Sequence, residues 1–438
     1  MKHDMKAKFL KNGIWLYSLQ LVNTVLPLLT IPYITRILGP SNYGVFSLAL
    51  NIVGYMQVVV EYGFGMSASR KAAIYSKDNE WDKLGILFPT IVYSRLIIFG
   101  LCGGVLWIVT AIALWNTSMV ICIWVLFLGL IGYCFQQNWF FQGIQEMKYI
   151  AIVSILSRTA SVIMIFALVN SSKDVLLYSV LYSVSPILNG FLGTYFAVKK
   201  YGMRFRKITV GKIIEEIKAG WNVFTTQLSA KVFGGIGVTF LGLLSTDYYV
   251  GIYSAIQKIP NVMMLCWSPI SQVLYPASSK IATESFISGK KRIFKIRRII
   301  LLIAVLGVTC VSFASSMLVT FILGEEYGAY SKIVIPLLWW VVLGINNNFL
   351  GIQLLLGGGY DKEYSKCFQI SVIFTIIANY GLIMFLGIEG AAYAPILSEG
   401  VLSILLWREI RKIEKVTVRN IEYYGEKSGK SKVKTYRD

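Results

Sequence analysis

Residues 23–67 read NTVLPLLTIPYITRILGPSNYGVFSLALNIVGYMQVVVEYGFGMS, and this stretch decides the fold. An apolar run that contains Pro27 and Pro32 ends at Arg36, the tight turn LGPSNYG follows, and a second apolar run leads to Glu61. Runs of about twenty apolar residues are long enough to cross the hydrocarbon of a bilayer. The stretch therefore predicts a helical hairpin in a membrane, with prolines that weaken its first arm.

The same device returns 207 residues later in the chain. Residues 243–255 read LLSTDYYVGIYSA, in which Gly251-Ile252-Tyr253-Ser254 repeats Gly44-Val45-Phe46-Ser47. The amide-rich stretch QQNW at 136–139 is echoed by NNNF at 346–349. Six predicted spans separate the copies, which is an even number, so both halves have the same orientation. This pattern predicts two homologous halves that form a parallel repeat, an arrangement typical of transporters.

Composition places most of the chain in lipid rather than in water. Hydrophobic residues make up 56% of the 438 residues, and the mean hydropathy is +0.63. The net charge of +20 lies in short segments between apolar runs and not on one basic face, so we expect no nucleic-acid partner. The six cysteines fall in or at the edge of apolar runs, and His3 is the only histidine. These residues have neither disulfide nor metal-ligand spacing, and we expect no metal and no cofactor.

Twelve apolar runs have spanning length, so the sequence predicts an all-α polytopic membrane protein with twelve transmembrane helices. The runs cover about 12–37, 44–67, 85–114, 119–141, 150–169, 175–198, 220–244, 248–275, 299–323, 332–356, 366–387 and 390–407.

Lysine and arginine set the predicted topology. With a cytoplasmic N-terminus, 35 of the 42 Lys and Arg residues fall in cytoplasmic segments, and Arg36, Lys173 and Lys332 lie on the opposite face. Both termini are therefore expected in the cytoplasm, and the first apolar run is expected to be an uncleaved span. The expected parts are an N-terminal six-helix bundle at 1–198, a basic cytoplasmic connecting segment at 199–219 that forms a short surface helix, a C-terminal six-helix bundle at 220–407, and a basic cytoplasmic tail at 408–438.

Cations inside the predicted spans are the strongest candidates for function. Each costs several kcal/mol in lipid unless it faces a partner or a water-filled cavity. Lys231 and Lys258 lie near the middle of their spans, where they either line a cavity or hold helices together as ion pairs. Arg95 and Arg158 lie nearer the cytoplasmic ends, so their side chains can also reach the interface.

Two acids also lie inside predicted spans. Glu61 either pairs with a cation or belongs to a gate, and Glu399 is either a proton-titrating group or a counter-ion. Four cations against two anions predict a cavity for a multiply anionic solute, such as a phosphate or pyrophosphate.

Amide side chains form the last group of candidates. Gln137 and Asn347 lie in the two echoed stretches, beside aromatic residues. Such a combination suits a pocket for sugars, and interhelical hydrogen bonds explain it equally well. No nucleotide-binding or hydrolase motif is present and the predicted outer loops are short, so we expect no enzyme and no catalytic residue.

The hairpin LPLLTIPYITRILGPSNYGVFSLA, the acid in EYGFGMSASR and the stretch NWFFQGIQEMKYIA carry a family resemblance. They resemble polysaccharide-biosynthesis flippases of the O-antigen (Wzx) type, which belong to the multidrug/oligosaccharidyl-lipid/polysaccharide exporter superfamily. The resemblance implies a MATE-like fold, with two six-helix bundles that form a V around a central cavity. It also implies alternating access in the bacterial cytoplasmic (inner) membrane. The implied substrate is an undecaprenyl-pyrophosphate-linked oligosaccharide, an O-antigen or capsule repeat unit, which moves from the inner to the outer leaflet.

The resemblance also implies roles and partners. Lys231 and Lys258 match the cationic lumen of the family best, and Arg36 is expected to meet the pyrophosphate at the exit. The lipid bilayer is one implied partner, and a polysaccharide polymerase and a chain-length regulator are candidate partners. The expected substrate-binding residues are Lys231, Lys258, Arg158, Arg95, Arg36, Asn347 and Gln137, and the expected coupling or gating residues are Glu61, Glu399, Pro27 and Pro32.

Three other functions compete with this interpretation. A cation-coupled multidrug exporter of the same fold would favour an acidic or aromatic cavity, which four interior cations argue against. A polysaccharide polymerase or ligase would need a sizeable external loop for its active groups. A scaffold for a biosynthetic complex would leave the charges at midspan unexplained.

Overall fold

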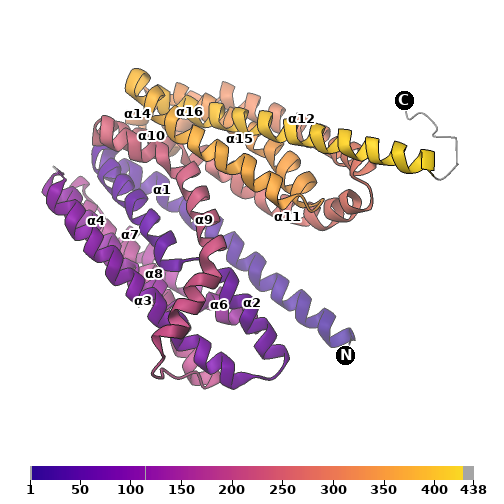
Figure 1. Cartoon of the computed structure of the whole chain (residues 1–438). Coiled ribbons are helices and arrows are strands. Elements are labelled where there is room, and N and C mark those ends of the chain that lie inside the picture. Colours follow the sequence, from indigo (N-terminus) through magenta and orange to yellow (C-terminus); the bar gives the residue numbers. More distant parts are fainter. Residues whose placement is uncertain (1, 114, 428–438) are drawn as a thin grey trace. The chain divides into compact units, whose positions relative to one another are not determined.

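The computed structural model describes residues 2–113 and 115–427, which form helices and turns and contain no strand (Figure 1). They make two compact units. The first comprises residues up to Ala255 together with Val319–Ala329, and the second comprises Ile256–Leu318 together with the residues from Tyr330 onward. The boundary thus lies beyond the predicted connecting segment, and the division into two six-helix bundles stays a prediction.

The first unit holds the N-terminal helices and also includes the short segment at 319–329, which comes later in the chain. Its elements are α1 (Lys2–Glu61), α2 (Phe64–Lys77), α3 (Trp81–Ile112), α4 (Thr117–Gly129), α5 (Ile131–Cys134), α6 (Asn138–Gly143), α7 (Met147–Leu168), the 3-10 turn η1 (Ser172–Asp174), α8 (Val175–Tyr201), α9 (Val210–Leu244), α10 (Asp247–Ile256), the end of α13 (Ser315–Leu323) and α14 (Glu325–Gly328).

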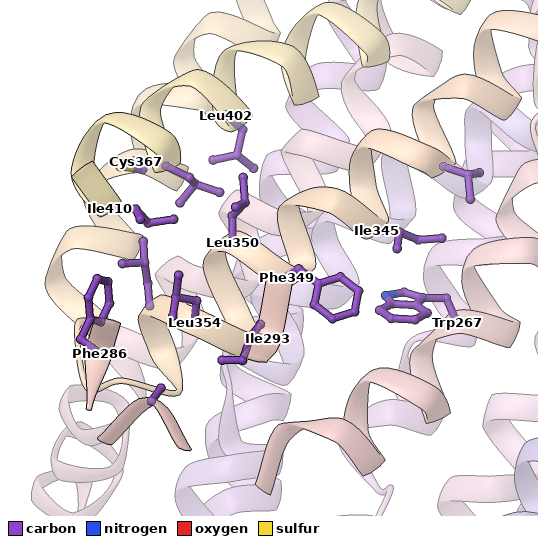
Figure 2. Close-up of a cluster of buried hydrophobic side chains, with 14 residues drawn as sticks. Trp267, Phe286, Ile293, Ile345, Phe349, Leu350, Leu354, Cys367, Leu402 and Ile410 are labelled. Atoms are coloured by element: carbon purple, nitrogen blue, oxygen red, sulfur yellow. The ribbon is translucent and has the colours of Figure 1, made fainter. Parts of the chain in front are cut away.

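The second unit holds the remaining helices around one apolar core (Figure 2). Trp267, Phe349 and Ile345 pack together at one end of this core, and Phe286, Leu354 and Ile410 lie at the other. Its elements are α11 (Lys258–Glu284), α12 (Phe286–Phe313), the 3-10 turn η2 (Ser331–Ile333), α15 (Val334–Asn347), the π-helix η3 (Asn348–Leu356) and α16 (Asp361–Lys427).

Nine helical stretches of the described residues are long and apolar enough to cross a membrane. This confirms the predicted all-α, multi-pass membrane protein, while the number twelve and the orientation of the termini stay predictions. The nine stretches are Asn12–Lys77, Trp81–Ile112, Thr117–Gly143, Met147–Leu168, Ser172–Tyr201, Val210–Leu244, Phe286–Phe313, Ser331–Leu356 and Asp361–Arg419.

Two of the long helices are broken at a glycine. Helix α1 has 60 residues, and Gly39 inside it has φ 68° and ψ 170°, so the helix stops there and restarts at Pro40. Glycine tolerates this left-handed φ, and proline suits the first position of the restarted helix. Helix α16 has the same kind of break at Gly387, with φ 56°. Both breaks lie at turns that the sequence predicts between successive spans.

The basic segment 199–219 differs from its prediction as a separate short helix. Helix α8 continues to Tyr201, the next eight residues are not helical, and Val210 already begins the 35-residue helix α9. The helix of the following span begins before its apolar residues and includes the charged ones, because lysine, glutamate and alanine are all good helix formers. The predicted surface helix is therefore the first part of α9.

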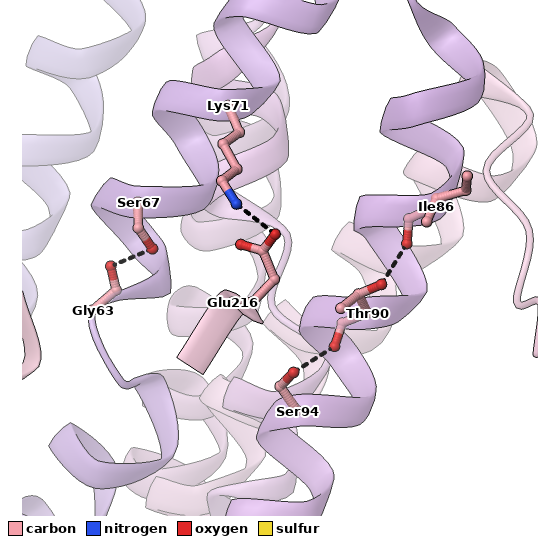
Figure 3. A network of polar contacts seen from close by, with 7 residues as sticks. All are labelled: Gly63, Ser67, Lys71, Ile86, Thr90, Ser94 and Glu216. Atoms are coloured by element: carbon pink, nitrogen blue, oxygen red, sulfur yellow. Dashed lines mark hydrogen bonds and ion pairs between the residues drawn. The ribbon is translucent and has the colours of Figure 1, made fainter. Parts of the chain in front are cut away.

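A charged pair fastens this first part of α9 to α2 (Figure 3). The Nζ of Lys71 lies 2.6 Å from Oε1 of Glu216, and the glutamate side chain is only 9% exposed. Next to it, Tyr62 stacks on Phe224 with ring centroids 4.5 Å apart. The start of α9 is thus held against α2 and the end of α1, while its expected position on the membrane surface stays a prediction.

Candidate functional site

Lys231 is the predicted site residue with the most developed polar surroundings. It lies on α9, half-buried, and its Nζ donates to Oδ1 of Asn51 on α1 at 3.2 Å. The same ammonium lies 5.2 Å from the ring centroid of Tyr55, a cation–π distance. Asn51 in turn donates to Thr239 at 2.8 Å, and the Tyr55 hydroxyl lies 3.1 Å from the same threonine. Asn51, Tyr55 and Thr239 were missed by the sequence analysis, because nothing in the pattern pairs α1 with α9.

Arg158 is a charged residue in the middle of a spanning helix of the first unit. It lies in the middle of α7, and its side chain is exposed. No hydrogen bond or ion pair holds its guanidinium within the described part of the chain, although Tyr133 and Tyr182 are close enough to interact with it electrostatically. An exposed cation at midspan faces either lipid or water, and the cost in lipid favours water.

Arg95 has a different environment. It is 4% exposed, and its Nη1 donates to the carbonyls of Tyr133 at 3.1 Å and Gln136 at 2.8 Å. These carbonyls belong to the break between α5 and α6, where regular helical hydrogen bonding is interrupted. The guanidinium therefore holds the two short helices in place, a role that the sequence analysis did not consider for this residue.

Gln137 and Glu61 also have local partners. Gln137 is 1% exposed and donates to the carbonyl of Phe135 at 3.1 Å and to Thr194 at 3.2 Å. Glu61 ends α1 and accepts a 2.8 Å hydrogen bond from Gln57. Arg95 is close enough to Glu61 to interact with it electrostatically, and the role of this acid stays a prediction.

Arg36 lies on the first arm of α1, three residues before the break at Gly39. Its side chain is exposed, and its Nη2 donates to the carbonyl of Phe321 in the returning segment of the first unit. The neighbouring Thr35 donates to the carbonyl of Leu323 at 3.2 Å. Pro27 and Pro32 lie further back in the same arm.

The second unit has its own polar network around Glu399. This carboxylate is 7% exposed and accepts from Nδ2 of Asn347 at 2.6 Å. The Oδ1 of Asn347 accepts from Ser403 at 2.5 Å and from Asn346 at 3.3 Å. Thus two residues that were predicted from separate sequence clues, Asn347 and Glu399, are in direct contact.

Arg297 extends this network and was missed. Its Nε and Nη2 donate to Oδ1 of Asn346 at 2.8 and 2.5 Å, and its guanidinium lies over the rings of Phe294 and Trp407. The sequence analysis placed Arg297 between the predicted spans 248–275 and 299–323, in a segment expected on the cytoplasmic side. Helix α12 begins at Phe286, so Arg297 is helical, and its side chain contacts Asn346 within the second unit.

Lys258 is the first residue of α11 and is half-buried. Within the described residues no hydrogen bond or ion pair to its ammonium is present. The candidates therefore fall into two sets, with Lys231, Arg158 and Arg36 in the first unit and Lys258 and the Glu399 network in the second. The described residues contain no group of three or more His, Cys, Asp or Glu that could hold a metal ion.

Comparison with known proteins identifies the family. Residues 9–282 match the family described as "Polysaccharide biosynthesis protein". Over 412 residues the chain is 26% identical to a protein of Escherichia coli (strain K12) named as an O-antigen transporter, covering 93% of this chain and 97% of that protein.

Solved structures share the fold at low sequence identity. An inward-facing multidrug-resistance MATE transporter of the MOP superfamily has a TM-score of 0.69 at 13% identity, covering 90% of this chain and 96% of its own. The lipid II flippase MurJ, in an inward closed conformation, has a TM-score of 0.66 at 12% identity, covering 92% of this chain and 87% of its own. The predicted MATE-like fold is thereby confirmed.

Proposed function

The chain belongs to the polysaccharide biosynthesis protein family, and we propose that it is a flippase for a lipid-linked oligosaccharide. The relative named as an O-antigen transporter and the structural likeness to a lipid II flippase support a lipid-linked glycan as the cargo. The finer proposal is an undecaprenyl-pyrophosphate-linked O-antigen or capsule repeat unit, carried from the inner to the outer leaflet of a bacterial cytoplasmic membrane.

The exposure of the Arg158 side chain is the observation that carries this proposal. Its guanidinium is exposed at the middle of α7, and a water-filled lumen beside it would lower the cost of this charge in a membrane. Lys231 adds a second cation in another helix of the same unit, and two such cations favour a multiply anionic group. A pyrophosphate is such a group, and the glycan attached to it would lie in the same water-filled space.

The proposed mechanism is alternating access. Lys231 and Arg158 of the first unit bind the pyrophosphate while the polyprenyl tail stays in lipid, and the lumen then opens to the other leaflet. Lys258 of the second unit is a further proposed substrate-binding residue. An inside-negative potential helps to expel the anion by about 2.3 kcal/mol per charge per 100 mV when the whole field is crossed. Bending of α1 at Pro27 and Pro32 and release of Arg36 from the Phe321 carbonyl would form part of the outer gate. Arg95 and Gln137 hold helices in place in this scheme.

The flippase proposal predicts where substrate accumulates when the protein is removed. In cells depleted of the protein, lipid-linked oligosaccharide should build up on the inner leaflet and surface polysaccharide should be lost. Leaflet-selective enzymatic labelling of the glycan measures the first effect, and re-expression of the chain should reverse both. Accumulation on the outer leaflet would instead indicate a polymerase or ligase step and would contradict the proposal.

Glu399 allows a test of ion coupling, which also bears on the second candidate function, a cation-coupled multidrug exporter. Glu399→Gln keeps an oxygen that can accept from Asn347 but removes the titratable group. We expect the stimulation of glycolipid flipping by a pH gradient, measured in proteoliposomes, to fall at least about tenfold in this variant. Glu389→Gln, an exposed change on the same helix, is the control. If Glu399→Gln flips like the unchanged protein under all gradients, Glu399 has no coupling role.

A further inference from the structure

The last part of α16 presents a groove lined by positive charge. The groove has a volume of about 430 Å³. It is lined by five cations and one apolar residue, namely Arg408, Arg411, Lys412, Lys415, Arg419 and Val416. All six side chains are exposed.

Helix geometry gathers these cations on one face. Their spacing of three and four residues repeats once per turn, so they lie above one another along the helix. The opposite face of the helix packs against the second unit. Ile410 is completely buried in the core of this unit, and Glu414 accepts a hydrogen bond from Lys290 of α12 at 2.6 Å. Lys412 has a carboxylate neighbour, Glu409 at 3.7 Å, which is a weak exposed pair. The face is thus strongly positive and points away from its own unit.

The length of α16 before this basic face indicates at what depth in a bilayer the face would lie. After the break at Gly387, α16 runs without interruption through the predicted span 390–407 into the basic residues, and it extends beyond the other helices of its unit (Figure 1). Those eighteen residues, most of them apolar, give roughly 27 Å of helix, close to the thickness of the hydrocarbon. Arg408, Arg411 and Lys412 follow within about 6 Å, the depth of one headgroup layer. Lys415 and Arg419 lie further out along the axis.

We propose that the groove formed by Arg408, Arg411 and Lys412 binds the phosphate groups of acidic phospholipids in the leaflet next to the C-terminus. Cations immediately after a membrane span attract anionic headgroups, and the attraction fades within a Debye length of about 8 Å. The groove therefore supplies both the charge and the position that such a headgroup requires. This lipid site uses other cations than those proposed for the transported glycolipid, so the lipid proposal holds whether or not the flippase proposal is correct.

The test measures lipid affinity of the full-length protein by native mass spectrometry, titrating phosphatidylglycerol against phosphatidylcholine from mixed micelles. The unchanged protein should prefer phosphatidylglycerol, and the triple variant Arg408→Gln, Arg411→Gln, Lys412→Gln should lose this preference by about a hundredfold. The matched control carries the same loss of two arginines and one lysine in the exposed stretch between α8 and α9, namely Arg204→Gln, Arg206→Gln, Lys207→Gln.

Two further arms make the result decisive. The pair Lys415→Gln, Arg419→Gln lies beyond the headgroup layer and should change the preference less than about fivefold. Inorganic phosphate and pyrophosphate, added at millimolar concentration, should displace little of the bound lipid. An equal loss in the Arg204 control, or complete displacement by free phosphate, would overturn the proposal.

Folding of the variants is checked by circular dichroism. Should the triple variant not fold, the salt dependence of the unchanged protein decides the question. Its preference for phosphatidylglycerol should fall about tenfold between about 50 mM and about 500 mM salt, and a constant preference would overturn the proposal.

Discussion

Lys231→Met should lower the rate of glycolipid flipping by about ten- to a hundredfold. Methionine keeps the length and the apolar stem of lysine, so the helix packing should survive while the charge is lost. A hydrogen bond from a charged donor contributes about 1.5–3 kcal/mol, which corresponds to this range of rates. Lys231→Arg keeps the charge and should retain most of the activity.

The measurement is flipping of a pyrophosphate-linked oligosaccharide in proteoliposomes that contain equal amounts of folded protein. Lys173→Met is the control, because Lys173 is exposed in the short turn η1, at the very start of the stretch Ser172–Tyr201. The double change Lys231→Met, Lys258→Met tests both units together and should abolish flipping. Near-normal flipping by the double variant would refute the cationic lumen and with it the proposed substrate chemistry.

Sequence reasoning succeeded where a local rule decides the structure. The apolar runs predict the membrane-crossing helices, and glycine followed by proline predicts the break at Gly39, because both residues restrict the backbone locally. The contact between Asn347 and Glu399 was beyond such reasoning, because the two lie on different helices whose packing depends on tertiary fit.

Arg95 and Arg297 also have contacts that the sequence could not predict. Charge inside an apolar run marked Arg95 as a candidate for substrate binding, but the break between α5 and α6 gives it backbone carbonyls to bind. No sequence rule predicted that break. Arg297 was assigned to the segment between two predicted spans, because the basic residues there interrupt the apolar pattern. Lysine and arginine are nevertheless good helix formers, and α12 already begins at Phe286. In both cases the sequence identified the charge but not the partner.

Gly44→Ala should destabilise the protein by about 3 kcal/mol, the upper part of the range for an extra methyl group in a close-packed site. A Cβ at Gly44 would meet the backbone of α10, with Gly251 N 2.9 Å away and the Asp247 carbonyl closer still. A Cβ at Gly251 would likewise meet the Pro40 carbonyl and lie 3.0 Å from Gly44 N. Backbone cannot move aside as a flexible side chain can, so the clash must separate α1 from α10.

The control for this change is Gly100→Ala in the long helix α3, where an added Cβ meets nothing within 4 Å. There the substitution should be neutral or stabilise the helix by up to about 1 kcal/mol, because alanine is the better helix former. Thermal unfolding in detergent and the yield of folded protein measure both effects, and equal stability of the two variants would contradict the close contact. The two glycines are the first residues of the repeated four-residue motif. The two copies of this motif, from which two homologous halves are predicted, therefore lie against each other in the first unit. The hairpin at 23–67 is therefore held by its own counterpart, and a movement of α1 at Gly39 must carry α10 with it or break this contact.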